Sequence, residues 1–314
     1  MEETFSVKPV PPFRLDLTVW TLRRRPDNAV DRWDGQSYER ILDLDGHRVK
    51  LEVTQTAPPE APRLEIKLVG PRTASNLKPA VVAAVERLLG IRIDLTDFYR
   101  LAARDAKLGP LVDRFRGMKP PRFSNIFEAL TNGIACQQVT LTQGIRVLNR
   151  LAQEYGPSFE GTNGFPSPEV IAEQKPEALR RLGLSHQKAD YLIGLGRAVV
   201  EGRIDLEGLG ELDNAAVVKR LTELRGIGRW TAEYALLRGF GRLDVFPGDD
   251  VGAWNNLQRW LHLRKPRDYD SVRRIVSRWQ PYAGLIYFHL LLDRLDEAGY
   301  LPLEDKREES HGRG

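Results

Sequence analysis

The chain has very little sulfur and no long apolar run. It contains 1 cysteine and 2 methionines among 314 residues. A single cysteine excludes an internal disulfide framework and any four-cysteine zinc or iron–sulfur site built by this chain alone. No apolar run approaches the ~20 residues that a membrane-spanning helix needs, and the N-terminus lacks the charged start and apolar core of a signal peptide. We therefore expect a cytoplasmic protein without a membrane partner.

The excess of positive charge is small. There are 47 basic and 43 acidic residues, a net charge of +4 at pH 7, which permits a polyanionic partner but does not establish one. The 5 histidines show no paired ligand spacing, so we interpret them as surface or packed residues rather than metal ligands. These histidines are His47, His186, His262, His289 and His311.

The hydrophobic pattern changes its period near residue 75. Before it, three segments alternate apolar and polar residues, which is typical of half-buried antiparallel strands: Phe13–Val19, His47–Val53 and Arg63–Gly70. After it, periods of three and four predict a series of about ten helices, the first within Lys78–Gly90. No repeat of fixed period is present, which argues against a helical solenoid.

This change predicts an α+β fold that is predominantly helical. We expect an N-terminal antiparallel β-sheet subdomain with flanking helices at residues 1–112, and a helical core at 113–302. The charged, glycine-containing segment 303–314 is predicted to be a disordered tail. The sheet is expected mainly to pack against the helices.

One stretch, Leu221 to Asp250, combines a glycine turn, aromatic residues and two acids. The letters "RGIG" interrupt a helical pattern that resumes in "RWTAEYALLRGF". Gly226 and Gly228 are expected to adopt positive φ angles and to let the turn approach another surface, where exposed amides can bind a phosphate. An ordinary helix–turn–helix connector explains the glycines equally well.

The acids and the aromatic residues each have a simpler structural explanation. Asp249 and Asp250 precede the helix predicted from "VGAWNNLQRWL", and either acid could serve only as its N-cap. Trp230 and Tyr234 lie one helical turn apart, a spacing that usually packs a core.

The combination of "LRGIGRWTA" with "DVFPGDD" resembles the helix-hairpin-helix (HhH-GPD) DNA glycosylase superfamily, and within it the DNA-3-methyladenine glycosylase II branch. The segments "FEALTNGIACQQVT", "LGLSHQKADYL" and "RWQPY" and the strand-rich N-terminus extend the resemblance to nearly the whole chain. It implies a two-lobed all-α glycosylase core with the hairpin near residues 216–240. It also implies a monomer that binds damaged double-stranded DNA, in the cytoplasm or, in a bacterium, associated with the nucleoid.

The implied activity is monofunctional base excision repair of alkylated purines of the 3-methyladenine type. Asp250 matches the family's catalytic aspartate, which stabilises an oxocarbenium-like transition state or activates water. Trp230 stands where lyase-active relatives carry a lysine nucleophile. Tryptophan cannot form a Schiff base, so the strand stays uncut after hydrolysis of the N-glycosidic bond leaves an abasic site. Trp230, Tyr234 and Gln137 are implied to form the base pocket, with cation–π attraction of ~0.5–2 kcal/mol for a cationic base.

The resemblance also assigns residues that hold the DNA. Gln138 matches the wedge that enters the minor groove when a base is flipped, although a buried glutamine bonded to a neighbouring backbone group is the alternative. No cofactor is implied to be required, but a structural Na⁺ or K⁺ is implied at the backbone of Thr222, Leu224 and Ile227. Five hairpin residues are implied to hold the phosphate backbone. These residues are Gly226, Ile227, Gly228, Arg229 and Thr231.

Several residues do not follow the family pattern or have more than one explanation. The family's further pocket aromatic, on the C-terminal helix, aligns with Leu291, with Tyr287 and Phe288 nearby, so the base preference stays open. Cys136 is interpreted as a small core residue rather than a nucleophile. The basic run Leu22–Arg25 fits either a DNA contact or a solvated strand end.

Two rival functions remain. A non-catalytic helix-hairpin-helix DNA-binding protein would keep the hairpin, but the acid in its motif context argues against it. An oxidised-purine (8-oxoguanine-type) glycosylase/lyase is disfavoured by Trp230 at the lysine position.

Overall fold

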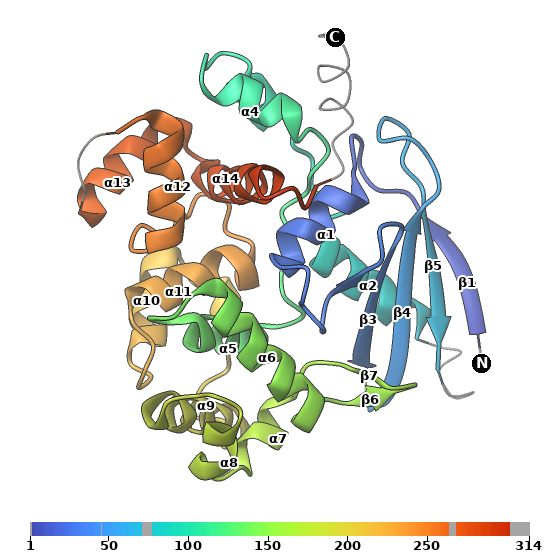
Figure 1. Cartoon of the computed structure of the whole chain (residues 1–314), viewed down its shortest axis with the longest axis vertical. Coiled ribbons are helices and arrows are strands. Elements are labelled where there is room, and N and C mark those ends of the chain that lie inside the picture. Colours follow the sequence, from blue (N-terminus) through green and yellow to red (C-terminus); the bar gives the residue numbers. More distant parts are fainter. Residues whose placement is uncertain (1, 45, 71–76, 264–267, 302–314) are drawn as a thin grey trace, which may run out of the picture.

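The computed structural model describes residues 2–44, 46–70, 77–263 and 268–301. A five-stranded antiparallel sheet lies on one side of the molecule, and helices make up the rest (Figure 1). The predicted α+β class with a predominantly helical core is therefore confirmed. Within the described ranges, no helix is both long and apolar enough to span a bilayer. The tail predicted at 303–314 lies outside the described residues.

The sheet has the strand order β1-β5-β4-β3-β2. Its strands are β1 Glu2–Val7, β2 Arg32–Trp33, β3 Ser37–Leu44, β4 His47–Gln55 and β5 Leu64–Val69. A small hairpin follows later, with β6 Ser158–Phe159 and β7 Thr162–Asn163. The alternating patterns of β4 and β5 were predicted correctly, because every second side chain of these strands is buried in the core.

The α-helices are described in chain order, in three successive stretches of the sequence. The first group is α1 Leu15–Arg23, α2 Lys78–Leu89, α3 Thr96–Ala102, α4 Leu108–Arg114, α5 Ile126–Cys136 and α6 Leu141–Tyr155. The second is α7 Pro168–Ala172, α8 Pro176–Arg181, α9 His186–Val200, α10 Asn214–Thr222 and α11 Arg229–Ala235. The last is α12 Val251–Leu261, α13 Tyr269–Val276 and α14 Ala283–Glu297. Short helical turns lie at η2 Gly208–Glu211, η3 Leu236–Phe240 and η4 Ser277–Trp279.

The strand predicted at Phe13–Val19 is wrong, because most of this segment belongs to helix α1. Eight of its nine residues are buried, so the helix has no solvent-exposed polar face. Its apolar residues happen to fall at alternate positions. The hydroxyls of Thr18 and Thr21 donate to the carbonyls of Arg14 and Leu17, at 2.8 Å each. These bonds satisfy the threonines inside a helix, although β-branched residues favour strands in sequence-based reasoning.

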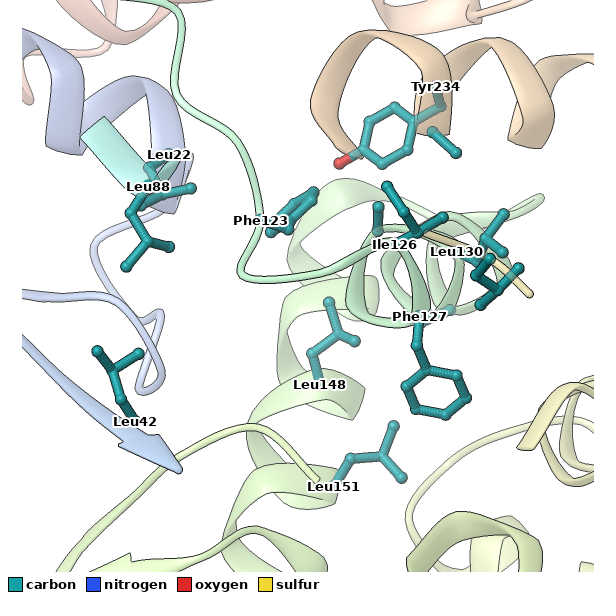
Figure 2. Packing of buried hydrophobic residues seen from close by; sticks show 14 of the residues in the cluster. Leu22, Leu42, Leu88, Phe123, Ile126, Phe127, Leu130, Leu148, Leu151 and Tyr234 are labelled. Carbon is teal, nitrogen blue, oxygen red and sulfur yellow. The ribbon is translucent and has the colours of Figure 1, made fainter. Parts of the chain in front are cut away.

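Two hydrophobic cores hold the molecule together. The larger one joins the sheet and α2 to α5, α6, α9, α10 and α11, and Figure 2 shows its centre, where Phe123, Ile126 and Tyr234 come together. The second core is built by α1, α3 and α4 with α12, α13 and α14. Leu236 belongs to the first core and Leu237 to the second, so the two cores meet at η3. Both cores cross the predicted boundary at residue 112, which itself stays a prediction.

A buried ion-pair network fixes the sheet to the helical core. Arg40 of β3 is 1% exposed and contacts Asp31 Oδ1 and Glu128 Oε2, at 2.6 Å each. Tyr38 donates its hydroxyl hydrogen bond to the same Asp31 oxygen at 2.8 Å. Glu128 lies in α5, so the sheet packs on the helices, as expected, and holds the helix that leads to the α5–α6 turn at residues 137–140.

Candidate active site

The glycine turn places α10 and α11 at an angle beside the end of α5. The amide of Ile227 closes the turn on the carbonyl of Leu224 at 3.1 Å, and α11 starts directly after Gly228. The first helical hydrogen bond runs from the amide of Ala232 to the carbonyl of Gly228. The amides of Arg229, Trp230 and Thr231, in the first turn of α11, therefore have no carbonyl acceptor within the helix. Such a helix start favours an anion.

The two glycines of the turn differ in conformation. Gly226 has φ +89°, as predicted, and a Cβ there would lie 2.2 Å from Cγ of Tyr191. The positive φ predicted for Gly228 is wrong: it has φ −92° and ψ 178°, an extended N-cap conformation that any residue adopts. No atom of the described chain lies within 4 Å of a Cβ built on Gly228. Gly226 therefore serves the fold, whereas Gly228 leaves the surface of the hairpin open.

Asp250 caps α12 and is also bonded to the aromatic residues beside it. Its Oδ1 accepts from the amide of Ala253 at 2.8 Å. Its Oδ2 accepts from Nε1 of Trp230 at 3.0 Å and from the hydroxyl of Tyr287 at 3.4 Å. The capping role considered from the sequence is thus real, and the cap bond helps to fix the orientation of the carboxylate.

The neighbouring acid, Asp249, has a cationic partner. Nε of Arg229 lies 2.7 Å from Asp249 Oδ2. Among the residues that the structure describes, none forms an ion pair with Asp250, whose recorded donors are all neutral. A carboxylate without a fixed cation keeps its charge available for a positive centre that develops nearby. Of the two acids, only Asp249 therefore has a cationic partner among the described residues, and the catalytic role of Asp250 stays a prediction.

Trp230 and Tyr234 lie on one face of α11, with ring centroids 5.7 Å apart and an interplanar angle of 32°. Trp230 is half-buried, while Tyr234 is 3% exposed and belongs to the larger core. Burial raises the pKa of the Tyr234 hydroxyl, which therefore stays neutral. Trp230 is thus the accessible ring of the pair, and Tyr234 supports it from the protein interior; the base-pocket role of both stays a prediction.

Gln137 and Gln138 are neighbours in the chain but have different surroundings. Nε2 of Gln137 donates to the carbonyl of Gly226 at 2.9 Å and to Oγ1 of Thr231 at 3.0 Å, so it joins the α5–α6 turn to the hairpin. Gln138 is exposed at the tip of that turn with φ +53°. The alternative of a backbone-bonded glutamine therefore describes Gln137, which is half-buried, and not Gln138. The wedge and pocket roles themselves stay predictions.

Two further side chains reach the site, although the sequence assigned neither of them a definite role there. Arg24, the left-handed C-cap of α1, is 4% exposed and donates to the hydroxyl of Tyr234 at 2.7 Å and to Asn132 Oδ1 at 2.6 Å. No carboxylate of the described chain forms an ion pair with Arg24. The basic run therefore lies at the C-terminal end of helix α1 and not at a solvated strand end. Within it, Arg24 is buried.

The second of these side chains comes from α14. Tyr287, and not the aligned Leu291, bonds to Asp250. Burial, with a smaller contribution from Asp250, holds the pKa of Tyr287 well above its ordinary value, so its hydroxyl stays a donor. The sequence named Tyr287 only as a neighbour of the aligned position, because helical spacing alone does not say which of several adjacent residues faces the acid.

A surface cavity of about 470 Å³ lies between the α5–α6 turn, the start of α9 and the hairpin. Its lining includes both glutamines, Lys188, and the turn residues Thr222, Leu224 and Ile227. The Na⁺ or K⁺ implied at the backbone carbonyls of these three turn residues stays a prediction. Cys136, next to the turn, is half-buried, and burial raises the pKa of its thiol.

Comparison with known proteins gives consistent results. The sequence profile of the HhH-GPD superfamily base excision DNA repair proteins matches residues 132–281. DNA-3-methyladenine glycosylase 2 of Escherichia coli is 27% identical over 283 residues, which cover 89% of this chain and 94% of that protein. The solved 3-methyladenine DNA-glycosylase from Archaeoglobus fulgidus superposes with a TM-score of 0.80 at 25% identity, covering 95% of this chain and 100% of that one.

A third relative is known in complex with DNA. The 3-methyladenine DNA glycosylase of Schizosaccharomyces pombe, solved with abasic-DNA, superposes with a TM-score of 0.55 at 28% identity. The match covers 62% of this chain and 95% of that protein. The profile match contains the hairpin, Trp230 and Asp250, together with Gln137 and Gln138.

Proposed function

Because the chain belongs to the HhH-GPD superfamily of base excision DNA repair proteins, we propose that it is a monofunctional DNA glycosylase for alkylated purines. It hydrolyses the N-glycosidic bond of 3-methyladenine-type lesions in double-stranded DNA and leaves an abasic site. The observation that carries the proposal is the hydrogen bond between Trp230 and Asp250, because it places an aromatic face and a carboxylate side by side.

Asp250 performs the charge stabilisation. Departure of the base builds positive charge on the deoxyribose, and a preorganised carboxylate lowers the energy of this oxocarbenium-like transition state. Its three neutral donors fix its orientation without cancelling its charge. A carboxylate in this position can also orient or deprotonate the attacking water. One acid suffices, because an alkylated purine is already cationic and leaves without protonation.

Trp230 sets the type of reaction and contributes to base recognition. An indole cannot form the Schiff base that strand cleavage needs, so the product keeps an intact backbone. Its half-buried ring offers a face on which a flipped cationic base can stack, with an attraction of ~0.5–2 kcal/mol. This chemistry favours alkylated purines over neutral oxidised ones, which supports the glycosylase over the glycosylase/lyase alternative.

The hairpin and the α5–α6 turn hold the DNA. The leading amides of α11 donate to a phosphate, and the open surface at Gly228 lets the backbone approach. Exposed Gln138 fills the gap that the flipped nucleotide leaves. A Na⁺ or K⁺ bound by Thr222, Leu224 and Ile227 would add positive charge beside that phosphate. We further propose that the enzyme acts as a monomer in the cytoplasm, associated with the nucleoid in a bacterial cell.

Base release from single-lesion duplexes tests the proposal. The panel is 3-methyladenine, 7-methylguanine, hypoxanthine, ethenoadenine and 8-oxoguanine, with wild type and Asp250→Asn. We expect release of the methylated bases by the wild type, a loss of at least about 100-fold in the variant, and strand breaks only after alkali. Equal DNA binding by two inactive proteins would support a non-catalytic binding protein instead. Strand cleavage without alkali would support the lyase.

A further inference from the structure

Glu233 is a buried carboxylate on the same helix as Trp230. It is 7% exposed, and both of its oxygens have partners outside α11. Oε2 accepts from the amide of Gly248 at 3.1 Å, 15 residues further along the chain, and Oε1 accepts from the hydroxyl of Tyr269. Glu233 thus ties α11 to the loop Pro247–Asp249, which leads directly into Asp250.

Tyr269 completes the attachment of this loop. It is the first residue of α13, and a Cβ on Gly248 would lie 2.7 Å from Cδ2 of its ring, so ring and loop are in close contact. The guanidinium of Arg229 lies 3.6 Å above the centre of the same ring, while its Nε contacts Asp249 at 2.7 Å. The loop before Asp250 is therefore held at the Gly248 amide, the Gly248 Cα and the Asp249 carboxylate.

We propose that Glu233 and Tyr269 are positioning residues that set the distance between Asp250 and the base-stacking face of Trp230. This inference rests on the proposed glycosylase function. Trp230 and Glu233 are three residues apart on one helix, so a bond from Glu233 to the loop links the aromatic face and the acid in a fixed geometry. A displacement of ~1 Å in a reacting group costs about 100-fold in rate, which gives the loop's anchoring a catalytic consequence.

The protonation states agree with this role. Burial raises the pKa of Glu233, and the bonds from Tyr269 and Gly248 oppose that shift because they favour the ionised acceptor. Burial, together with Glu233, raises the pKa of Tyr269 to about 12, so the phenol remains a donor. The other charged groups that face this pair are Asp249, Arg229 and Arg273.

The test compares Glu233→Ala with Glu233→Gln, because glutamine can accept from the Gly248 amide and donate to the Tyr269 oxygen. We measure single-turnover release of a methylated base, the dissociation constant for the lesion duplex and the urea midpoint. Glu233→Ala should slow release by about 10- to 100-fold while binding changes less than about threefold, and Glu233→Gln should recover most of the rate. In an Asp250→Asn background, Glu233→Ala should add no further loss. Glu201→Ala, which removes an exposed carboxylate paired with Arg203, is the matched control.

Three results would overturn the inference. They are a wild-type rate for Glu233→Ala, a rate loss matched by an equal loss of DNA binding, and full additivity with Asp250→Asn. If Glu233→Ala does not fold, Tyr269→Phe keeps the ring against Gly248 and removes only the hydroxyl; it should slow release in the same direction, and a wild-type rate there also overturns the inference. A wild type that releases no alkylated base refutes the proposed function itself, whereas an active wild type with an equally active Glu233→Ala refutes only the positioning role.

Discussion

Nε1 of Trp230 donates a hydrogen bond to Oδ2 of Asp250 at 3.0 Å. The residue proposed to keep the DNA strand uncut thereby also orients the acid proposed to release the base. Trp230→Phe keeps an aromatic face but removes the donor, so we expect single-turnover base release to slow about tenfold or more, since a bond to a charged group contributes ~1.5–3 kcal/mol. Lesion affinity should change little. If the Trp230→Phe variant released the base as fast as the wild type, the bonds from Tyr287 and from the helix-cap amide would be sufficient to orient Asp250.

The two glycines of the hairpin should respond differently to alanine. Gly226→Ala combines a positive φ of 89° with a Cβ 2.2 Å from Tyr191, and should lower the free energy of unfolding by about 2–4 kcal/mol. Gly228→Ala has an ordinary φ and open space, so stability should stay within ~0.5 kcal/mol while DNA affinity falls. Urea unfolding and binding titrations separate the two effects. Wild-type DNA affinity for Gly228→Ala would mean that the phosphate does not approach this glycine.

The adjacent glutamines should separate stability from activity. Gln137→Ala removes the bonds to Gly226 and Thr231, and should cost about 1–2 kcal/mol of unfolding free energy. Gln138→Gly relieves a left-handed φ of 53°, so stability should not fall, whereas base release should slow at least about tenfold as the wedge is lost. Thermal unfolding and single-turnover kinetics on the same duplex check both variants. Unchanged release by Gln138→Gly would exclude it as the wedge.

Lys119 should make the free energy of unfolding depend on pH in the alkaline range. Its ammonium donates to the Ile93 carbonyl at 2.7 Å, and burial lowers its pKa from 10.5 to about 8. Between these pH values the unfolded chain binds more protons at this lysine than the folded chain does. The loss of stability caused by burying the charged lysine is therefore fully present below pH 8 and disappears as the pH rises to 10.5. The difference in unfolding free energy between wild type and Lys119→Met should therefore change by about 3 kcal/mol over this window. Exposed Lys175→Met should show no such change, and parallel curves for wild type and Lys119→Met would contradict the prediction.

Local sequence signals predicted much of this architecture and the centre of its site. The strands β4 and β5, the helix α2 with its glycine end, the hairpin at Gly226 and the cap at Asp250 all depend on contacts within a few residues, and all are present. Helix α1 was mistaken for a strand because burial on every side erases the amphipathic pattern. For such a segment only tertiary packing decides the secondary structure.

The parts of the site that were not predicted depend on distant contacts. Arg24 meets Tyr234 across 210 residues of sequence, and Tyr287 meets Asp250 across 37. Nothing in the spacing of either pair signals a partner, because the pairing exists only once α1 and α14 pack on the hairpin helices. The same holds for Glu233, whose polar character within an apolar helix was a signal that only the loop at Gly248 explains.

The meeting of the two cores at η3 has a consequence for how such an enzyme can be controlled. Trp230 stands on a helix of the first core, while Asp250 begins a helix whose Ala253 and Leu257 belong to the second. Their hydrogen bond therefore spans the junction between the two cores, and a small rotation of one core against the other would separate Trp230 from Asp250 while both cores remain folded.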